Sequence, residues 1–363
     1  MQRRSILLAA LASAAGVCAR AGEGGKAHSG GEMLDLPARM SAVADQRLIT
    51  GIARAGDRLV AVGQRGHIVH SSDGGRLWAQ SMVPVSTDLT AVRFVDDSIG
   101  YATGHDGVVL GTRDGGLGWT RLLDGRQANA LVLDQMRQRT AAADASDADR
   151  KLLDEARRNA EAGPDKPFLD LHFHSPSQGF VVGAYGLVLR TADGGKRWES
   201  WFDRVDNPGL LSIYAICAAR GATYAAGEAG LLLKLDADGR RFRALTSPYK
   251  GSFFGVVATS AGVLAFGMRG NAFLSVDEGQ TWQPVDTGLP ASIVSGAVAA
   301  NGTVALVDQG GSIALSVDGG RRFTRSGLRP QMPLAAVAFS SNASLVVGGP
   351  RGLRTVELAT KDK

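Results

Sequence analysis

Residues 183–201, GAYGLVLRTADGGKRWESW, contain the pattern that decides the fold of this 363-residue chain. The stretch combines two glycines three positions apart, a short apolar run and the phrase Asp-Gly-Gly-x-x-Trp. Related phrases recur along the chain, and in five of them an aromatic residue follows an aspartate by five positions. The acids are Asp73, Asp114, Asp193, Asp277 and Asp318, and the aromatic residues are Trp78, Trp119, Trp198, Trp282 and Phe323. Such a repeat indicates an array of equivalent structural units.

A second landmark, the pair of glycines, precedes each phrase. The pairs are Gly63/Gly66, Gly104/Gly107, Gly183/Gly186, Gly227/Gly230, Gly267/Gly270 and Gly349/Gly352, and one copy keeps only Gly310. The steps between copies are 41, 79, 44, 40, 40 and 42 residues. Glycine makes up 48 of the 363 residues, which suits many tight turns between short strands. Seven copies with a period in the forties predict a β-propeller.

The predicted fold class is therefore all-β, a seven-bladed β-propeller with a helical insert between blades two and three. The expected blades cover about residues 49–81, 89–123, 168–201, 210–245, 253–285, 293–326 and 334–358. The last copy has no Asp-Gly-Gly-x-x-Trp phrase, so its fourth strand is expected from residues 33–43. That exchange would join the two ends of the chain and remove the open edges of the array.

The insert is expected at residues 124–167, where one repeat step is almost doubled. Residues 127–161 contain no glycine or proline and predict helix, broken near 143–147. Ser146 and Asp149 suggest a capping box for the second helix. The apolar side chains available for packing are Leu131, Met136, Leu152 and Leu153. An insert of this length is typical of a functional loop, although a solvated decoration remains the alternative.

The N-terminal residues 1–21 are typical of a secretory signal peptide, because two arginines precede a short apolar run with small residues after it. Export by the twin-arginine or the general route remains open. Cleavage would leave 37 basic and 35 acidic residues, a balance that does not indicate nucleic-acid binding. Only Cys217 would then remain, so an internal disulfide is excluded. The protein is expected in the periplasm, or in the thylakoid lumen of a photosynthetic organism.

The repeated acids are predicted to be structural rather than catalytic. An aspartate at a tight turn can accept backbone N–H groups, and the glycines permit positive φ angles there. The tryptophans would bury a large apolar surface against their blades. The predicted structural residues are thus Asp73, Asp114, Asp193, Asp277, Asp318, Trp78, Trp119, Trp198 and Trp282.

A candidate binding face follows from the strand directions. The turns between the two glycines should share one face with the links between blades. The turns that contain the repeated aspartates, called Asp boxes, should lie on the other face. The residue before the second glycine then projects from the first face: Arg65, Asp106, Tyr185, Ala229, Arg269, Gln309 and Arg351 in chain order. Arginines in equivalent positions could bind carboxylates of a partner. The predicted partner-binding residues are Arg65, Arg269, Arg351 and Tyr185, and the alternative is that these arginines are only solvated.

Enzyme motifs are weak in this sequence. Asp-box repeats occur in sialidases, but no Arg-Ile-Pro phrase is present and no tyrosine has a supporting context for a nucleophile. Asp170, His172 and His174 alternate on one strand, without an evident fourth metal ligand. Phosphate-binding, dinucleotide-binding and serine-nucleophile motifs do not occur. We therefore expect no catalytic residues, metal or cofactor, and retain an exported glycoside hydrolase as the alternative.

The Gly-x-x-Gly turns and Asp-Gly-Gly-x-x-Trp phrases, in seven copies behind an export signal, resemble the photosystem II stability/assembly factor family. The resemblance covers about residues 31–358 apart from the insert. It implies a non-enzymatic scaffold that holds a membrane-protein client or its exported segment, and an arginine patch that maps to Arg65, Arg269 and Arg351. Two features depart from that pattern: the phrase of blade four is degraded to LLLKLDADGRRFRAL at residues 231–245, and the equivalent turn residues Asp106, Tyr185, Ala229 and Gln309 are not basic. A different membrane client is equally open, and a monomer is expected.

Overall fold

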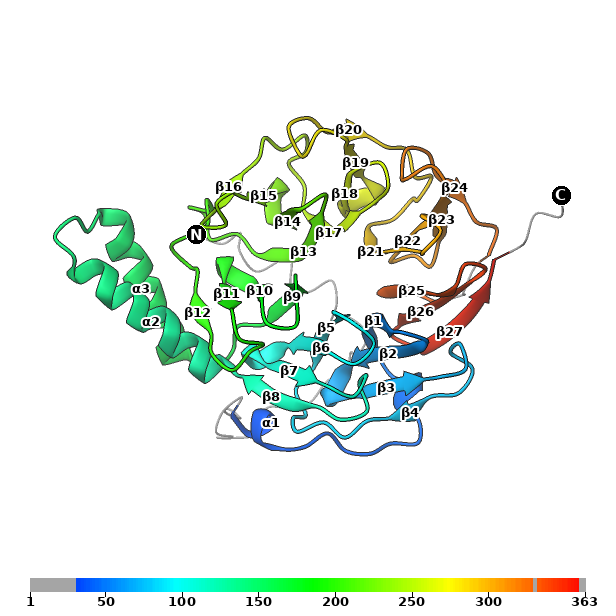
Figure 1. Cartoon of the computed structure of the whole chain (residues 1–363), viewed down its shortest axis with the longest axis horizontal. Coiled ribbons are helices and arrows are strands. Elements are labelled where there is room, and N and C mark those ends of the chain that lie inside the picture. Colours follow the sequence, from blue (N-terminus) through cyan, green and yellow to red (C-terminus); the bar gives the residue numbers. More distant parts are fainter. Residues whose placement is uncertain (1–30, 329–331, 359–363) are drawn as a thin grey trace, which may run out of the picture.

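Seven antiparallel sheets arranged in a ring make up the protein (Figure 1). The computed structural model describes residues 31–328 and 332–358. Within these residues, six sheets have four strands and one has three. Each sheet runs outward from a strand beside the centre of the ring (Figure 1). The predicted all-β, seven-bladed propeller with a helical insert between blades two and three is therefore confirmed.

The strands of each blade follow one another in the sequence, so one repeat forms one sheet. Blades one to three consist of β1 (Ile49–Ala55), β2 (Arg58–Gly63), β3 (Ile68–Ser71) and β4 (Ala79–Gln80); β5 (Leu89–Phe94), β6 (Gly100–Gly104), β7 (Val109–Thr112) and β8 (Thr120–Leu123); and β9 (Phe168–Phe173), β10 (Gly179–Gly183), β11 (Val188–Thr191) and β12 (Glu199–Ser200). Blades four and five consist of β13 (Ile213–Ala219), β14 (Ala222–Gly227), β15 (Leu232–Leu235) and β16 (Phe242–Ala244); and β17 (Phe253–Ala258), β18 (Val263–Gly267), β19 (Ala272–Ser275) and β20 (Gln283–Pro284). Blades six and seven consist of β21 (Ile293–Val298), β22 (Val304–Asp308), β23 (Ile313–Ser316) and β24 (Thr324–Arg325); and β25 (Ala336–Ser341), β26 (Ser344–Gly349) and β27 (Gly352–Glu357).

The hydrophobic core lies between neighbouring blades rather than within one sheet. Val60 and Val62 of blade one, for example, share a cluster with Val92, Leu110 and Trp119 of blade two. Both faces of an inner strand are therefore buried, which explains its nearly continuous apolar sequence. Since each blade needs a neighbour on either side, the ring must close to bury blades one and seven.

The expected closing strand at residues 33–43 is not formed. Residues Gly31–Asp35 form the short helix α1, and the chain then runs back along the link after β4. The N–H of Ala38 donates to the carbonyl of Val83 at 3.0 Å, and the carbonyl of Met33 accepts from the N–H of Ser86 at 2.9 Å. Leu34 is completely buried among apolar residues of blades one and two. This burial holds the segment on that side of the ring, so blade seven keeps three strands.

The ring closes instead by face-to-face packing of blade one against blade seven. Ile49 and Ile52 of β1 share an apolar cluster with Ala336, Ala338 and Val346 of blade seven. The ribbon places β1 and β2 directly beside β25 and β26 (Figure 1). Apolar contact therefore joins the ends of the array, without a shared sheet.

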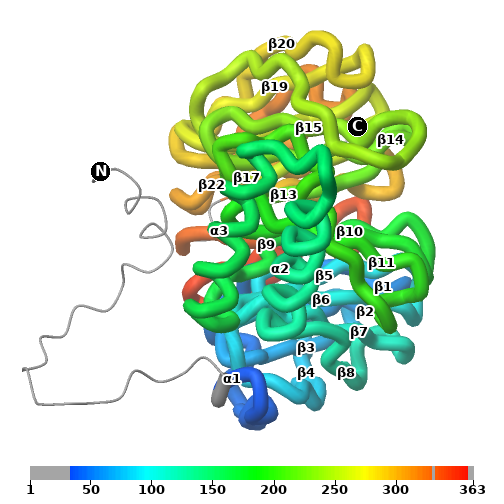
Figure 2. The backbone as a smooth tube through the Cα atoms, turned by 90° about the vertical axis from the view of Figure 1, so that its left-hand side faces the viewer, coloured from blue at the N-terminus to red at the C-terminus, as the bar shows by residue number. Residues whose placement is uncertain are grey.

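The helical insert is a two-helix hairpin that packs on the outside of blade three (Figure 2). It consists of α2 (Gly125–Ala141) and α3 (Asp147–Ala162). Val132 and Met136 of α2 and Leu153 of α3 are buried in one cluster with Phe168 and Trp198 of blade three. No helix within the described ranges is long and apolar enough to cross a membrane.

Both helices of the insert begin with capping boxes. The predicted Ser146–Asp149 box of α3 is present, and Asp124 with Gln127 forms a second one at the start of α2. Each cap satisfies backbone N–H groups that the first turn leaves without partners. The insert is thus a rigid extension of blade three rather than a loose loop.

Candidate functional site

The Gly-x-x-Gly turns lie on the face of the ring that also carries the links between blades, called here the link face. A Cβ at Gly63 would come within 1.9 Å of the carbonyl oxygen of Leu48, and one at Gly66 within 2.1 Å of that of Val85. Gly66 also has φ +71°, which other residues rarely adopt. Both glycines are therefore required by the close approach of the turn to the neighbouring links.

The residue between these glycines projects outward from a strained backbone position. Five of these residues have φ between 51° and 59°: Arg65, Asp106, Tyr185, Ala229 and Arg269. A left-handed backbone at a residue with a side chain is uncommon and is often found at functional positions. The repeated geometry holds these five side chains at equivalent places on the link face.

Arg65, Arg269 and Arg351 are exposed on the link face, as the turn position requires. The N–H of Arg65 donates to Asp88 Oδ1 at 2.7 Å, and that of Arg269 donates to Ser292 Oγ at 3.1 Å. Within the described parts of the chain, none of the three guanidinium groups takes part in an ion pair. The backbone of the first two turns is thus anchored while the guanidinium groups stay available to a partner.

The three arginines occupy one arc of the ring. Arg351 of blade seven and Arg65 of blade one lie on adjacent blades, and Arg269 of blade five lies two blades from Arg351. Tyr185 belongs to blade three, on the other side of blade two. Its ring is partly exposed, and Lys166 Nζ lies 5.1 Å from the ring centre. The structure therefore places Arg351 and Arg65 on adjacent blades, with Arg269 and Tyr185 each two blades away on opposite sides and Tyr185 beside the insert.

Asp106 is not a free acid within this ring. Its carboxyl turns inward, where Thr87 Oγ1 donates to Asp106 Oδ2 at 2.6 Å. Burial raises the pKa of Asp106 above its ordinary value, and the Thr87 bond only partly offsets this effect. The one acidic residue of the ring therefore opposes the arginines less than its sequence position suggests.

Blade six departs from the turn expected there. The strand register places Asp308 opposite Ile293, where the other blades have the first glycine, so the position equivalent to Arg65 is Gly310 rather than Gln309. The buried Asp308 carboxylate accepts the N–H of Ser312 at 2.7 Å and that of Ala291 at 3.3 Å. The Asp308 carboxylate thus lies where the other blades have a closely packed glycine. Because Gly310 is the residue between, this turn has no projecting side chain.

A hollow of about 400 Å³ lies at this bare turn. Its walls are residues Pro290, Gly310, Gly311, Ser312, Arg325, Met332 and Pro333. Arg325 Nη2 donates to Ser312 Oγ at 3.0 Å, which holds the guanidinium at the wall. The hollow separates the blades of Arg269 and Arg351, so this arc combines a concave surface with basic side chains. The sequence repeat marked the turn but not the hollow or Arg325.

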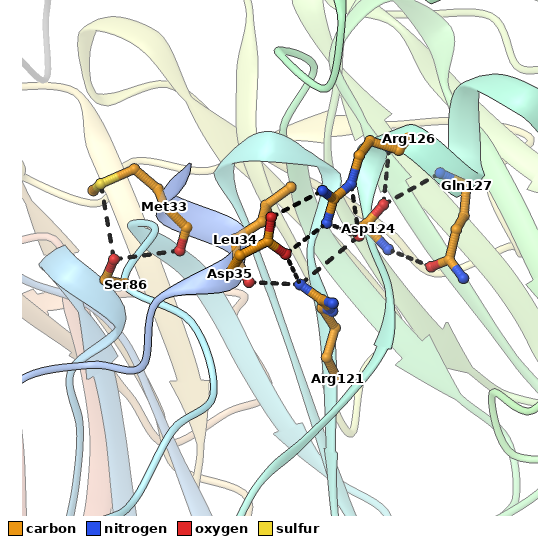
Figure 3. Close-up of polar contacts among 8 residues, drawn as sticks. All are labelled: Met33, Leu34, Asp35, Ser86, Arg121, Asp124, Arg126 and Gln127. Carbon is orange, nitrogen blue, oxygen red and sulfur yellow. Dashed lines mark hydrogen bonds and ion pairs between the residues drawn. The ribbon is translucent and has the colours of Figure 1, made fainter. Parts of the chain in front are cut away.

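The insert begins on the same face. Gly107 of the blade-two turn lies against Gly125, the first residue of α2. Figure 3 shows the polar contacts at this point: Asp35 of α1 forms a two-bond ion pair with Arg126 at 2.9 and 3.0 Å, and Arg126 also binds Asp124. Hydrogen bonds from Arg126 and Arg121 lower the pKa of Asp35 to about 2. These charges fix α1 against the root of the insert.

The outer surface of α3 is covered by ion pairs within the helix. They join Asp147 to Arg150, Asp154 to Arg157 and Glu155 to Arg158. Exposed pairs of this kind are solvated and contribute little stability. The charges of these three pairs therefore balance one another.

The Asp-box turns lie on the opposite face, called here the box face. Asp73 Oδ1 accepts the N–H groups of Arg76 and Leu77 at 2.9 and 3.0 Å. The pKa of Asp73 is lowered, mainly by the hydrogen bond from the Leu77 N–H and then by that from the Ser71 hydroxyl. The N–H four residues after the acid also reaches Asp114, Asp193, Asp277 and Asp318. Thr281 lowers the pKa of Asp277 to about 2, and the N–H of Arg322 lowers that of Asp318 to about 2. Each carboxylate is thus a turn acceptor rather than a free acid.

A hydroxyl residue two positions before each acid is a second part of the box that the sequence reasoning did not assign. Thr191 Oγ1 accepts the N–H of Gly195 at 2.9 Å and donates to Asp193 Oδ1 at 3.1 Å. The residues in this role are Ser71, Thr112, Thr191, Ser275 and Ser316. Its signal is a Ser or Thr at one fixed position in all five phrases.

The box tryptophans pack into the clusters between blades. Trp119, Trp198 and Trp282 are buried, and Trp78 is half-buried. The indole of Trp119 donates to the carbonyl of Gly116 at 3.1 Å. The degraded box of blade four keeps the same chemistry with one more residue, because Asp236 accepts the N–H groups of Arg240 and Arg241 at 2.8 and 3.0 Å.

Among the described residues, Asp170 is a buried acid at the centre of the ring. Asp170 Oδ2 accepts the N–H of Ile216 at 3.1 Å, and its carboxylate forms an ion pair with Arg93 at 3.1 Å, so it joins blades two, three and four. Burial, followed by the charges of His174 and Arg93, lowers the pKa of His172 to about 4. Among the described residues no cluster of three or more His, Cys, Asp or Glu could hold a metal ion.

A cavity of about 480 Å³ opens at the inner ends of blades one, two, six and seven. Its charged wall residues are Arg54 and Arg93, and the rest of its lining is small, apolar or uncharged. Among its described lining residues this cavity therefore presents no pair of carboxylates, which most glycosidases use.

Comparison with known proteins supports the family resemblance. The family model described as photosynthesis system II assembly factor YCF48 matches residues 154–282, which begin within α3 and end in blade five before β20. No curated protein matches the chain. The match confirms the resemblance to this family over those residues.

Solved structures agree on the fold. "YCF48 bound to D1 peptide" has a TM-score of 0.61 at 14% identity, covering 87% of this chain and 95% of that chain. YCF48 from Cyanidioschyzon merolae has a TM-score of 0.61 at 16% identity, covering 88% and 98%. A streptogramin B lyase has a TM-score of 0.66 at 11% identity, covering 88% and 96%. At these identities the likeness establishes the propeller, which serves binding proteins and enzymes alike.

Proposed function

Because residues 154–282 match the photosystem II assembly factor family, we propose that this protein is an exported, non-enzymatic scaffold for the assembly of a membrane-protein client. The client binds through a segment exposed on the exported side of the membrane. One solved relative in this family is described as bound to a D1 peptide, which supports a peptide segment as the part that is recognised. The proposed location is the periplasm, or the thylakoid lumen in a photosynthetic organism.

The observation that carries this proposal is the basic arc of the link face. Arg269 and Arg65 project from equivalent turns, Arg351 projects from the shorter turn between β26 and β27, and Arg325 lines the hollow at blade six. Guanidinium groups bind carboxylates through two parallel hydrogen bonds, so this arc suits an acidic segment of a client. The concave surface at Gly310 provides room for the bound chain.

The test is co-purification from native membranes of the source organism. The variant Arg65→Glu/Arg269→Glu/Arg351→Glu should retain its fold, since exposed turn positions rarely contribute more than about 0.5 kcal/mol. It should lose the client retained by the unaltered protein. The remaining binding should depend less on salt, because the screened attraction has been removed.

A matched control carries three Arg→Glu changes on the box face, at Arg76, Arg113 and Arg321. Equal loss in both variants would indicate a nonspecific effect of charge, and loss only in the control would place the binding site on the box face. The alternative of an exported glycoside hydrolase is tested on the same preparations with chromogenic glycosides. Turnover that persists in both variants would overturn the non-enzymatic assignment.

Export is tested separately. Mass determination of the mature N-terminus after expression in the source organism should give a chain that begins after Ala21. A full-length chain in the cytoplasmic fraction would contradict the proposed location.

A further inference from the structure

Blade seven differs from the other blades at its outer edge. In blades one to six a fourth strand pairs with the third, whereas within the described residues nothing pairs with the outer side of β27. An unpaired strand edge presents a row of backbone donors and acceptors that another extended chain can bind.

The register shows which groups of β27 face outward. The N–H of Leu358 donates to the carbonyl of Ala343 at 2.8 Å, and the pairing of β26 with β27 continues without a shift. Since inward and outward groups alternate along an antiparallel strand, Leu353, Thr355 and Glu357 direct their N–H and C=O groups outward. These residues can pair with a fourth strand while β26 stays bonded.

The carbonyl of Leu353 is the clearest sign of an incomplete sheet. Its equivalents in blades one and three, the carbonyls of Ile68 and Val188, each accept an N–H from the end of the fourth strand at 2.9 Å. In blade seven, Arg354 Nη1 donates to the Leu353 carbonyl at 2.7 Å instead. A flexible side chain thus occupies the acceptor, and an incoming strand can displace it.

Arg354 also stands where every other blade has a buried apolar residue. The equivalents are Val69, Leu110, Leu189, Leu233, Phe273 and Ala314, and all six are buried. Arg354 is exposed, and in the described chain its guanidinium forms no ion pair. A carboxylate on the residue opposite Arg354 would complement it.

We propose that the outer edge of β27 is a docking site for an extended segment of another protein with an acidic residue opposite Arg354, which joins blade seven as its fourth strand. The segment runs antiparallel to β27, as the fourth strands of the other blades do, and carries an acid opposite Arg354. This goes beyond the proposed function, because the site is a sheet edge and its recognition rests on backbone pairing rather than on the link-face arginines.

The probe is a fluorescent hexapeptide with blocked ends, Lys-Arg-Trp-Glu-Asp-Trp. It copies the fourth strand of blade three at residues 196–201, with aspartate in place of Ser200, the residue that pairs with the blade-three equivalent of Arg354. Binding to the full chain is measured by fluorescence anisotropy. We expect saturable binding, and at least about a tenfold loss for Arg354→Glu, which corresponds to about 1.4 kcal/mol.

Thr355→Pro tests backbone pairing directly. Proline removes an N–H that faces outward, so the β26–β27 ladder is kept. This variant should also lose at least about tenfold in affinity. Thr355→Val, the matched control, keeps the N–H and should bind as the unaltered chain does. If Thr355→Pro misfolds, a peptide N-methylated on alternate residues gives the same test on the unaltered protein, and it should not bind.

Hydrogen exchange identifies the occupant. In the free full chain the Thr355 and Glu357 amides should exchange rapidly, and the probe should protect them. Protection without the probe would mean that this chain fills its own edge, and a dimer abolished by Thr355→Pro would mean that a second copy does. Either of these two results would overturn the proposal. The absence of saturable probe binding would also overturn it, and so would equal binding by Thr355→Pro and Thr355→Val. Arg65→Glu should leave probe binding unchanged, so this test is independent of the link-face site.

Discussion

We expect the hydroxyl of Thr191 to stabilise its Asp-box turn by the full contribution of one buried hydrogen bond. Thr191 is 1% exposed, and its Oγ1 is the acceptor for the N–H of Gly195 at 2.9 Å. The change Thr191→Val keeps the shape of the side chain but leaves that N–H without its acceptor. A buried donor without a partner costs about 1–3 kcal/mol, and the preference of valine for strands offsets only a small part.

The free energy of unfolding is measured by urea denaturation, followed by tryptophan fluorescence. We expect Thr191→Val to lower it by about 1–3 kcal/mol, with faster hydrogen exchange at Gly195. Thr191→Ser keeps the hydroxyl and should lose less. Thr324→Val is a further control, because the Thr324 side chain is exposed and should matter by no more than about 0.5 kcal/mol. A Thr191→Val protein as stable as the Thr191→Ser protein, with Gly195 still protected, would refute this account of the box.

Two further stability predictions concern the N-terminal segment and the centre of the ring. Leu34→Ala should lower the free energy of unfolding by about 2–4 kcal/mol, because Leu34 is completely buried. Leu36 is 55% exposed, so Leu36→Ala should change this free energy by less than about 0.5 kcal/mol. Equal effects of the two changes in thermal melts would contradict the docking of this segment. The pKa of His172, about 4, keeps its imidazole neutral in the folded state, whereas in the unfolded chain the imidazole gains a proton near pH 6.5. The stability should therefore be fully present above pH 6.5. It should fall as the pH drops toward 4, by at most about 3 kcal/mol. In urea titrations at several pH values His172→Gln should reduce this dependence, and an unchanged slope would show that His172 does not cause it.

The repeat phrases were sufficient to predict the architecture because their information is local. Each copy contains its own apolar strands, and its turns are determined by residues a few positions apart, such as Asp193 and the glycines after it. The capping box at Ser146 is local in the same way. Equivalent turns also share a face in any propeller, so the outward position of Arg65 followed from the repeat alone.

The candidate site could be predicted only in part. The exposed arginines followed from the repeat, but the hollow at blade six depends on Pro290, Arg325 and Met332, which come from three different segments. The equivalence of Gly310 to Arg65 depends on the register of β21 with β22, which the glycine spacing alone did not show. Contacts between distant segments leave no periodic signal in the sequence.

By itself, the sequence determined the number of blades, the two faces and the helical insert, because these follow from periodic patterns and short-range hydrogen bonds. Only the tertiary structure decided the course of residues 33–43. Their apolar alternation suits a strand, but burial of Leu34 and the pairing of Asp35 with Arg121 and Arg126 draw the segment to blades one and two. Blade seven is left with three strands and the exposed Arg354 for the same reason. Whether a segment forms a strand depends on the distant residues with which it pairs, and these cannot be identified from the sequence of the segment itself.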